Sequence, residues 1–193
     1  MRKLTFDDIR DLREYERERE EFRRRLIEMK KRRLVQLGDL LTITFENTDT
    51  MRFQVQEMAR IERMLTDEQI RQEVDTYNQL IPDAGELSGT LFLEIDDKQR
   101  LYEWLPKLVG IQRAVSIWLH DGSSVASTPE EEERLTREET TTTVHYLKFQ
   151  FTDEQVAAFE QGPVRIVVDH EHYDAVVELT DDQQRELAHD LRS

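Results

Sequence analysis

The feature that most constrains the fold of this chain is a sequence pattern that occurs twice. The segments LFLEIDDKQRLYEWL and LKFQFTDEQVAAF each join an alternating apolar run, typical of a strand, to a run with helical spacing. Two more apolar runs follow each segment, separated by a short turn such as Asp121-Gly122 in the first copy. We therefore predict two tandem strand–helix–strand–strand units, in residues 87–128 and 144–193, and the likeness suggests gene duplication.

The residues before the repeat predict mostly helix. Residues 1–35 predict one long N-terminal helix, opened by the capping-box pair Thr5 and Asp8. Residues 36–86 predict a strand at Leu40–Phe45 and then a pair of helices, each with apolar residues at helical spacing.

The remaining segments complete the predicted architecture. Residues 129–143 combine an acidic run with a run of four consecutive threonines, residues 140–143, and predict a loop. The second unit ends in a C-terminal helix that Thr180 and Gln183 open as a capping box. We expect a single α+β domain over residues 1–193. A long N-terminal helix and a helical pair would pack with a mixed, antiparallel-rich sheet built from the two units.

Composition excludes several classes of protein. The chain has 193 residues with 42 acidic and 27 basic side chains, a net charge of −15, whereas general nucleic-acid binding needs a basic face. It has no cysteine, which excludes disulfides, thiol nucleophiles and thiolate-bound metals. No apolar run approaches the length of a membrane span, so we expect a cytoplasmic protein that does not insert into membranes.

Charge is unevenly distributed along the chain. Residues 1–33 carry a net charge of +4, and residues 34–193 carry −19. The candidate docking residues of this basic segment are Arg23, Arg24, Arg25, Lys31, Arg32 and Arg33. Two interpretations remain open at this point: a solvated structural helix, or an arm that docks on an acidic partner or on the acidic part of its own chain.

A polar cluster follows the predicted strand at Leu40–Phe45. The free N–H groups at the start of the next helix, together with its dipole, favour an anion there. The candidate ligand-binding residues of this cluster are Glu46, Asn47, Gln56, Glu57 and Arg60. The alternative interpretation is a helix cap followed by an ordinary polar helix face.

A second cluster lies between the last two predicted strands. Asp169, His170 and His172 combine two imidazoles with a carboxylate, a donor set that suits one transition metal such as iron, zinc or manganese. A polar hairpin turn in which His170 is hydrogen-bonded to the backbone explains the same residues without a metal.

Four segments of the chain resemble a bacterial family known as domain of unknown function 3501. They are EFRRRLIEMKKRR, FENTDTMRFQVQEMARIERM, YNQLIPDAGELSGTLFLEI and VHYLKFQFTDEQVAAFEQGPVRIVVDH, and the resemblance spans nearly the whole chain. The family pattern matches at Glu46, Asn47, Gln56, Glu57, Arg60, Tyr77, Asn78, Gly85, Glu86, Leu87, Ser88, His170 and Tyr173. These matches add Tyr77 and Asn78 to the ligand-binding candidates, whereas Glu171 departs from the pattern, which has a proline there.

The resemblance also implies a cellular context. Members of this family are encoded beside rubrerythrin-like proteins and beside iron–sulfur oxidoreductases, which implies a role in redox metabolism or peroxide defence. Our leading expectation is therefore a non-enzymatic accessory protein that docks on such a partner. An alternative is a metal- or small-ligand-dependent enzyme or sensor that joins the Glu46 cluster to His170 and Tyr173. A third is a homo-oligomer held through the N-terminal helix.

Overall fold

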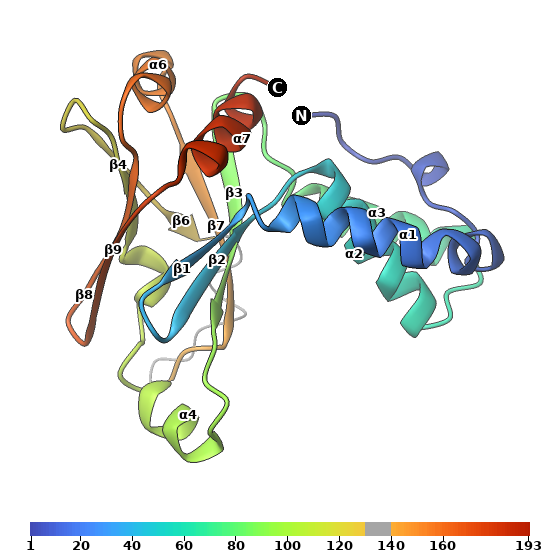
Figure 1. Ribbon diagram of the computed structural model, residues 1–193. Coiled ribbons are helices and arrows are strands. Elements are labelled where there is room, and N and C mark those ends of the chain that lie inside the picture. The colour runs from blue at the N-terminus through green and yellow to red at the C-terminus, as the bar shows by residue number, and fades with distance from the viewer. Residues whose placement is uncertain (130–139) are drawn as a thin grey trace.

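The computed structural model describes residues 1–129 and 140–193, and it confirms an α+β fold with an N-terminal helix and a helical pair (Figure 1). The helices are η1 (Phe6–Asp8), α1 (Leu12–Lys30), α2 (Thr48–Ile61), α3 (Asp67–Asn78), α4 (Lys98–Trp104), η2 (Ile111–Arg113), α6 (Asp153–Gln161) and α7 (Asp181–Leu191). The strands are β1 (Leu34–Leu37), β2 (Leu41–Phe45), β3 (Glu86–Leu93), β4 (Val115–Trp118), β5 (Ser124–Ala126), β6 (Thr128–Pro129), β7 (Val144–Gln150), β8 (Arg165–His170) and β9 (Tyr173–Glu178).

The strands form two sheets, whereas the sequence predicted one mixed sheet. The first sheet has the order β1-β2-β3-β7-β6 and the second β5-β4-β8-β9, and every pairing between described strands is antiparallel. In each unit the segment that contains α4 or α6 carries the chain from the first sheet to the second. Parallel neighbours do not arise, because the strand after the helix never returns beside the strand before it.

The order of elements predicted for the two units is confirmed. Corresponding strands of the two units pair with each other. β3 pairs with β7 at the centre of the first sheet, where Gly89 lies opposite Leu147. β4 pairs with β8 at the centre of the second sheet, where Ile117 lies opposite Ile166. The two units are therefore arranged about an approximate two-fold relation, which is compatible with the suggested duplication.

The main hydrophobic core lies between the two sheets. Ile43 and Phe149 of the first sheet and Ile117 and Ile166 of the second are all buried in one cluster. The burial of alternate residues along β7 and β8 is typical of strands with one face toward a core. Buried residues of α6 and α7 join the same cluster.

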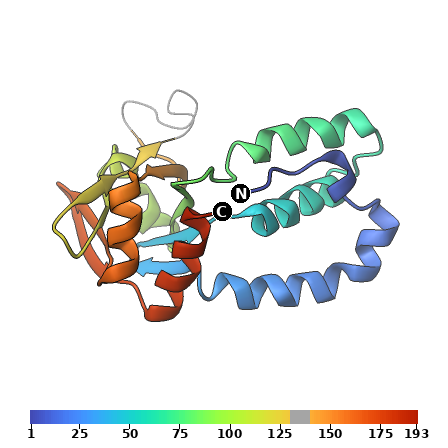
Figure 2. The ribbon, with the colours of Figure 1, turned by 90° about the horizontal axis from the view of Figure 1, so that it is seen from above.

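The helical part of the chain has a second, smaller core. Met51 and Val55 of α2 and Val74 of α3 pack there with Leu4 and Ile9 of the N-terminal segment. Figure 2 shows α1, α2 and α3 projecting together to one side of the sheets, with both ends of the chain lying where the two parts meet. None of the described helices is both long and apolar enough to span a bilayer.

The prediction of one uninterrupted N-terminal helix is wrong in its first turns. The Thr5 and Asp8 capping box is present, but it opens only the short helix η1. The side chain of Gln56 binds both the N–H and the carbonyl of Arg10, at 2.6 and 3.1 Å, so these groups cannot join a helix. The chain starts again at α1, where the Asp11 carboxylate accepts hydrogen bonds from two backbone N–H groups.

Strand β1 lies partly within the segment that was predicted as helix. Val35 and Leu37 are buried and their neighbours exposed, and the strand turns into β2 at Gly38, whose φ is +73°. The alternation of apolar and polar residues and the glycine that follows are the sequence features that indicate this strand and turn. Residues 130–139 of the predicted loop lie outside the described residues. At the end of that loop, the carbonyl of Thr143 accepts a hydrogen bond from the N–H of Leu93 in β3.

Tyr173 connects the two sheets at this turn. Its hydroxyl donates to the carbonyl of Leu37 at 2.5 Å and accepts the N–H of Leu40 at 3.2 Å. Burial raises the pKa of this phenol, so it remains a neutral donor. Tyr173 therefore holds β9 of the second sheet against the β1–β2 turn of the first.

We predict that Tyr173→Phe lowers the free energy of unfolding by about 1–3 kcal/mol, because it leaves two buried backbone groups without their partner. Urea unfolding at neutral pH measures the loss. Tyr102→Phe is the matched control, since the Tyr102 side chain is 65% exposed and should keep full stability. Equal stability of Tyr173→Phe and the parent chain would contradict this role.

Candidate functional site

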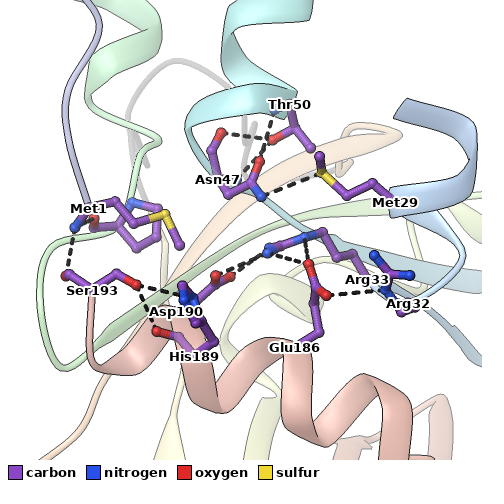
Figure 3. A network of polar contacts seen from close by, with 11 residues as sticks. Met1, Met29, Arg32, Arg33, Asn47, Thr50, Glu186, His189, Asp190 and Ser193 are labelled. Atoms are coloured by element: carbon purple, nitrogen blue, oxygen red, sulfur yellow. Dashed lines mark hydrogen bonds and ion pairs between the residues drawn. The ribbon is translucent and has the colours of Figure 1, made fainter. Parts of the chain in front are cut away.

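A cavity of about 320 Å³, lined mostly by polar residues, lies where the end of α1, the start of α2 and α7 meet. Met29, Asn47 and His189 line it, together with the buried guanidinium of Arg33 (Figure 3). Two of these residues lie at the ends of secondary-structure elements. Asn47 is the N-cap residue of α2, and Arg33 ends the turn between α1 and β1.

Arg33 is the central group of the junction. Its side chain is 2% exposed and binds Asp190, also 2% exposed, through two hydrogen bonds of 2.5 and 3.0 Å. Glu186 accepts two further hydrogen bonds from the same guanidinium, at 3.1 and 2.9 Å. Arg33 was predicted as a docking residue, and this is corrected: it is buried and its charge is neutralised within the chain.

Asn47 and Glu46 are placed by the end of β2. The Asn47 carboxamide oxygen accepts the Thr50 N–H at 2.9 Å and so caps α2. The Glu46 side chain is 5% exposed and accepts a hydrogen bond of 2.6 Å from the Thr90 hydroxyl. Asn47 therefore serves as a cap, and Glu46 faces β3 rather than open solvent.

Two other ligand-binding candidates are amides that hold the N-terminal segment. Gln56 is fully buried and binds both backbone groups of Arg10. Asn78 binds both backbone groups of Leu4, accepting from the N–H at 2.7 Å and donating to the carbonyl at 2.9 Å. The peptide-like amide of each side chain matches a backbone N–H and carbonyl pair, so the chain's own first residues occupy these groups.

Glu57 and Arg60 form a second ionic network, between α1 and α2. The Glu57 carboxylate accepts hydrogen bonds from the Tyr15 hydroxyl at 2.7 Å and from Arg19 at 2.8 and 3.0 Å. Arg60 donates to the same carboxylate at 3.1 and 3.3 Å. The hydrogen bond from Arg19 is the largest of the causes that lower the pKa of Glu57 to about 2.

Tyr77, the remaining ligand-binding candidate, lies on α3 and is half-buried. Burial raises the pKa of its phenol.

The predicted metal residues do not converge. His170 Nε2 lies 2.9 Å from the Val109 carbonyl, and the His170 and His172 ring centres are 6.1 Å apart. Over residues 1–129 and 140–193, no three histidine, aspartate or glutamate side chains are close enough together to hold a metal ion. The geometry matches the polar-hairpin interpretation of Asp169, His170 and His172.

The structure also does not bring the Glu46 cluster to Tyr173. The Tyr173 hydroxyl contacts Leu40 at the start of β2, whereas Glu46 follows its far end. Six extended residues separate these positions by roughly 20 Å. Groups that act on a reacting atom must come within about 3 Å of it, so the two sets cannot form the joint site that the sequence allowed.

The other docking candidates lie on the outside of the helical part. Arg23, Arg24 and Arg25 are exposed on α1. Lys31 pairs with Glu28 at 2.8 Å, and Arg32 pairs with Glu186 at 3.1 Å. The Lys31 and Arg32 side chains are nevertheless exposed. These five basic residues remain accessible to a partner.

The sequence reasoning missed the roles of Tyr15, Arg19, Glu186 and Asp190. Glu186 and Asp190 are four residues apart on α7, and Tyr15 and Arg19 are four apart on α1, so each pair shares one helix face. The four-residue spacing within each pair could have been noticed in the sequence, but it does not indicate which distant residues the pair binds. Their partners are 38 to 157 residues away along the chain.

We predict that Glu57→Gln destabilises the chain at neutral pH by about 1–3 kcal/mol, because the charged hydrogen bonds are weakened. The pKa of Glu57 is lowered in the folded state, so its contribution is complete above pH 4.5 and is lost as the pH falls toward 2. Urea unfolding should therefore show the two proteins converging in stability over that range. A difference that is constant with pH would contradict the assignment, and Glu18→Gln on the exposed side of α1 is the control.

We predict that Arg33→Met costs about 3–5 kcal/mol of stability, because two carboxylates lose their cation at a buried position. The double variant with Asp190→Leu should cost less than the sum of the two single changes, since it removes the charge that the first change leaves unpaired. Urea unfolding of the four proteins gives the coupling energy. Additive losses would show that the two side chains act independently.

Comparisons with known proteins bear on the fold and the family of this chain. The chain is similar to a protein of unknown function from Burkholderia pseudomallei K96243, whose crystal structure was determined at 1.90 Å resolution. The two are 34% identical with a TM-score of 0.91, over 98% of this chain and 100% of the other. A search of curated proteins gave no match. The model of the family "Protein of unknown function (DUF3501)" matches residues 3–191, and the chain therefore belongs to that family.

Proposed function

We propose that this chain is a non-enzymatic accessory protein that binds an acidic protein partner through the exposed basic face of α1. The partner that the sequence resemblance favours is a redox protein, either a rubrerythrin or an iron–sulfur oxidoreductase. The observation that carries the proposal is the accessible group of Arg23, Arg24 and Arg25 on a chain whose net charge is −15.

Charge complementarity supports an acidic partner. Residues 22–33 hold seven basic side chains and one acidic one, although the chain as a whole is strongly acidic. Only Arg33 of the seven is buried. A concentrated positive face accelerates encounter with an acidic surface and disfavours basic partners. An acidic redox partner would attract this basic face and repel the acidic remainder of the chain.

The inner face of α1 supports the proposal because it fixes the helix in place. Tyr15 and Leu26 are buried, and Arg19 is bound to Glu57 of α2. At its end the helix runs into Arg33, whose ion pairs hold the turn against α7. A helix that is already ordered loses little conformational freedom on binding, so its outer face is prepared for a partner.

The test uses purified partners. We predict that the charge-reversal variant Arg23→Glu, Arg24→Glu, Arg25→Glu binds the purified rubrerythrin or iron–sulfur oxidoreductase at least about tenfold more weakly than the parent chain, a loss of about 1.4 kcal/mol. Binding of the parent chain should also weaken as salt rises. A titration with immobilised chain measures both effects.

The matched control changes the net charge equally at another place. The variant Lys98→Glu, Arg100→Glu, Lys107→Glu reverses three exposed basic residues in and after α4. It should bind the partner nearly as well as the parent chain. If both triple variants weaken partner binding equally, net charge alone explains the effect and the proposed face is wrong. If the α1 variant binds the partner as well as the parent chain does, the proposal is refuted.

A further inference from the structure

Ile27 is an exposed apolar residue at the centre of the basic face. Its side chain is 48% exposed, whereas the preceding residue, Leu26, is 3% exposed. The positions three and four residues away along a helix are the neighbours of a given side chain on the helix surface. For Ile27 these positions are Arg23, Arg24, Lys30 and Lys31, and all four are basic.

This arrangement differs from an ordinary solvated helix face. Two basic side chains precede the branched apolar residue along its helix face and two follow it, within α1 and its C-cap. Lys31 makes an exposed ion pair with Glu28, in which the two side chains are 64% and 69% exposed. Such pairs are weak in water, so a carboxylate of a partner can replace Glu28 at little cost.

We propose that Ile27 is the apolar centre of a docking face on α1, and that the face takes an acidic amphipathic helix of the partner. This inference rests on the proposed function and adds the form of the partner. The matching helix carries one apolar residue with aspartate or glutamate three and four positions away on either side. Its apolar residue packs against Ile27, and its carboxylates meet the four basic side chains.

Physical reasons favour a helix as the occupant. The four basic positions span about two helical turns, from residue 23 to residue 31, and a second helix presents side chains with the same spacing. Ion pairs around the edge exclude water from the central contact, which raises the contribution of a small apolar centre. Because the charge around Ile27 is positive, the ring on the partner must be negative.

The experiment uses the full-length chain and two synthetic peptides labelled with a fluorophore. Both peptides are helical and have glutamate three and four residues on either side of a central position. One has leucine at that position and the other has serine. Fluorescence anisotropy measures the affinity of the parent chain and of Ile27→Ala for each peptide. Ile61→Ala is the control, because Ile61 is 63% exposed but lies on α2.

The parent chain and Ile61→Ala should bind the leucine peptide about tenfold more tightly than the serine peptide. Ile27→Ala should lose this preference while keeping the weaker, salt-dependent binding of both peptides. Equal binding of the two peptides by the parent chain would overturn the inference, as would a preference that persists in Ile27→Ala. Since Ile27 is exposed, its replacement should leave the urea unfolding curve nearly unchanged, which shows that the variant is folded.

Failure of this inference is distinguishable from failure of the proposed function. If the charge-reversal variant loses the redox partner and Ile27→Ala binds it fully, the apolar centre is wrong and the basic docking face stands. If charge reversal has no effect, both fall. Dimerisation of the parent chain that Ile27→Ala abolishes would assign the face to a second copy of this chain and overturn the acidic-helix partner.

Discussion

The buried ion pair between Arg33 and Asp190 joins the helical part of this chain to its sheets. Removing two charges from water is costly, and the attraction between them offsets that cost only where the geometry is good and the remaining polar atoms are satisfied. Here Glu186 binds the other side of the guanidinium, so the cation is enclosed by two carboxylates (Figure 3). The end of α1 is thereby fixed against α7, and the position of the whole helix follows from it.

The other anchors of the helical part use polar side chains in the same way. Gln56 and Asn78 hold the backbone of the first ten residues, and Glu57 holds α1 through Tyr15 and Arg19. These side chains look like a ligand site in the sequence because amides and carboxylates serve both purposes. These side chains are engaged inside the chain, whereas the basic side chains on the outer face of α1 stay exposed.

Local signals in the sequence predicted much of the fold. The capping box predicted at Thr180 opens α7, and the same motif opens α3 at Thr66 and α6 at Thr152, because such a pair acts within four residues and needs no tertiary contact. The break after Asp8 and the division of strands into two sheets could not be predicted in this way. They depend on contacts such as Gln56 with Arg10 and β3 with β7, whose residues are far apart in the sequence. The candidate site followed the same rule: the basic face was visible as a local run, whereas the burial of Arg33 depends on α7.

Chemical cross-linking can show whether a partner binds the outer face of α1. The chain has six lysines, at positions 3, 30, 31, 98, 107 and 148, and a carbodiimide joins a lysine to a carboxylate that touches it. We expect cross-links to the purified redox partner at Lys30 and Lys31. Cross-links confined to Lys98, Lys107 and Lys148 would place the partner elsewhere and refute binding at α1.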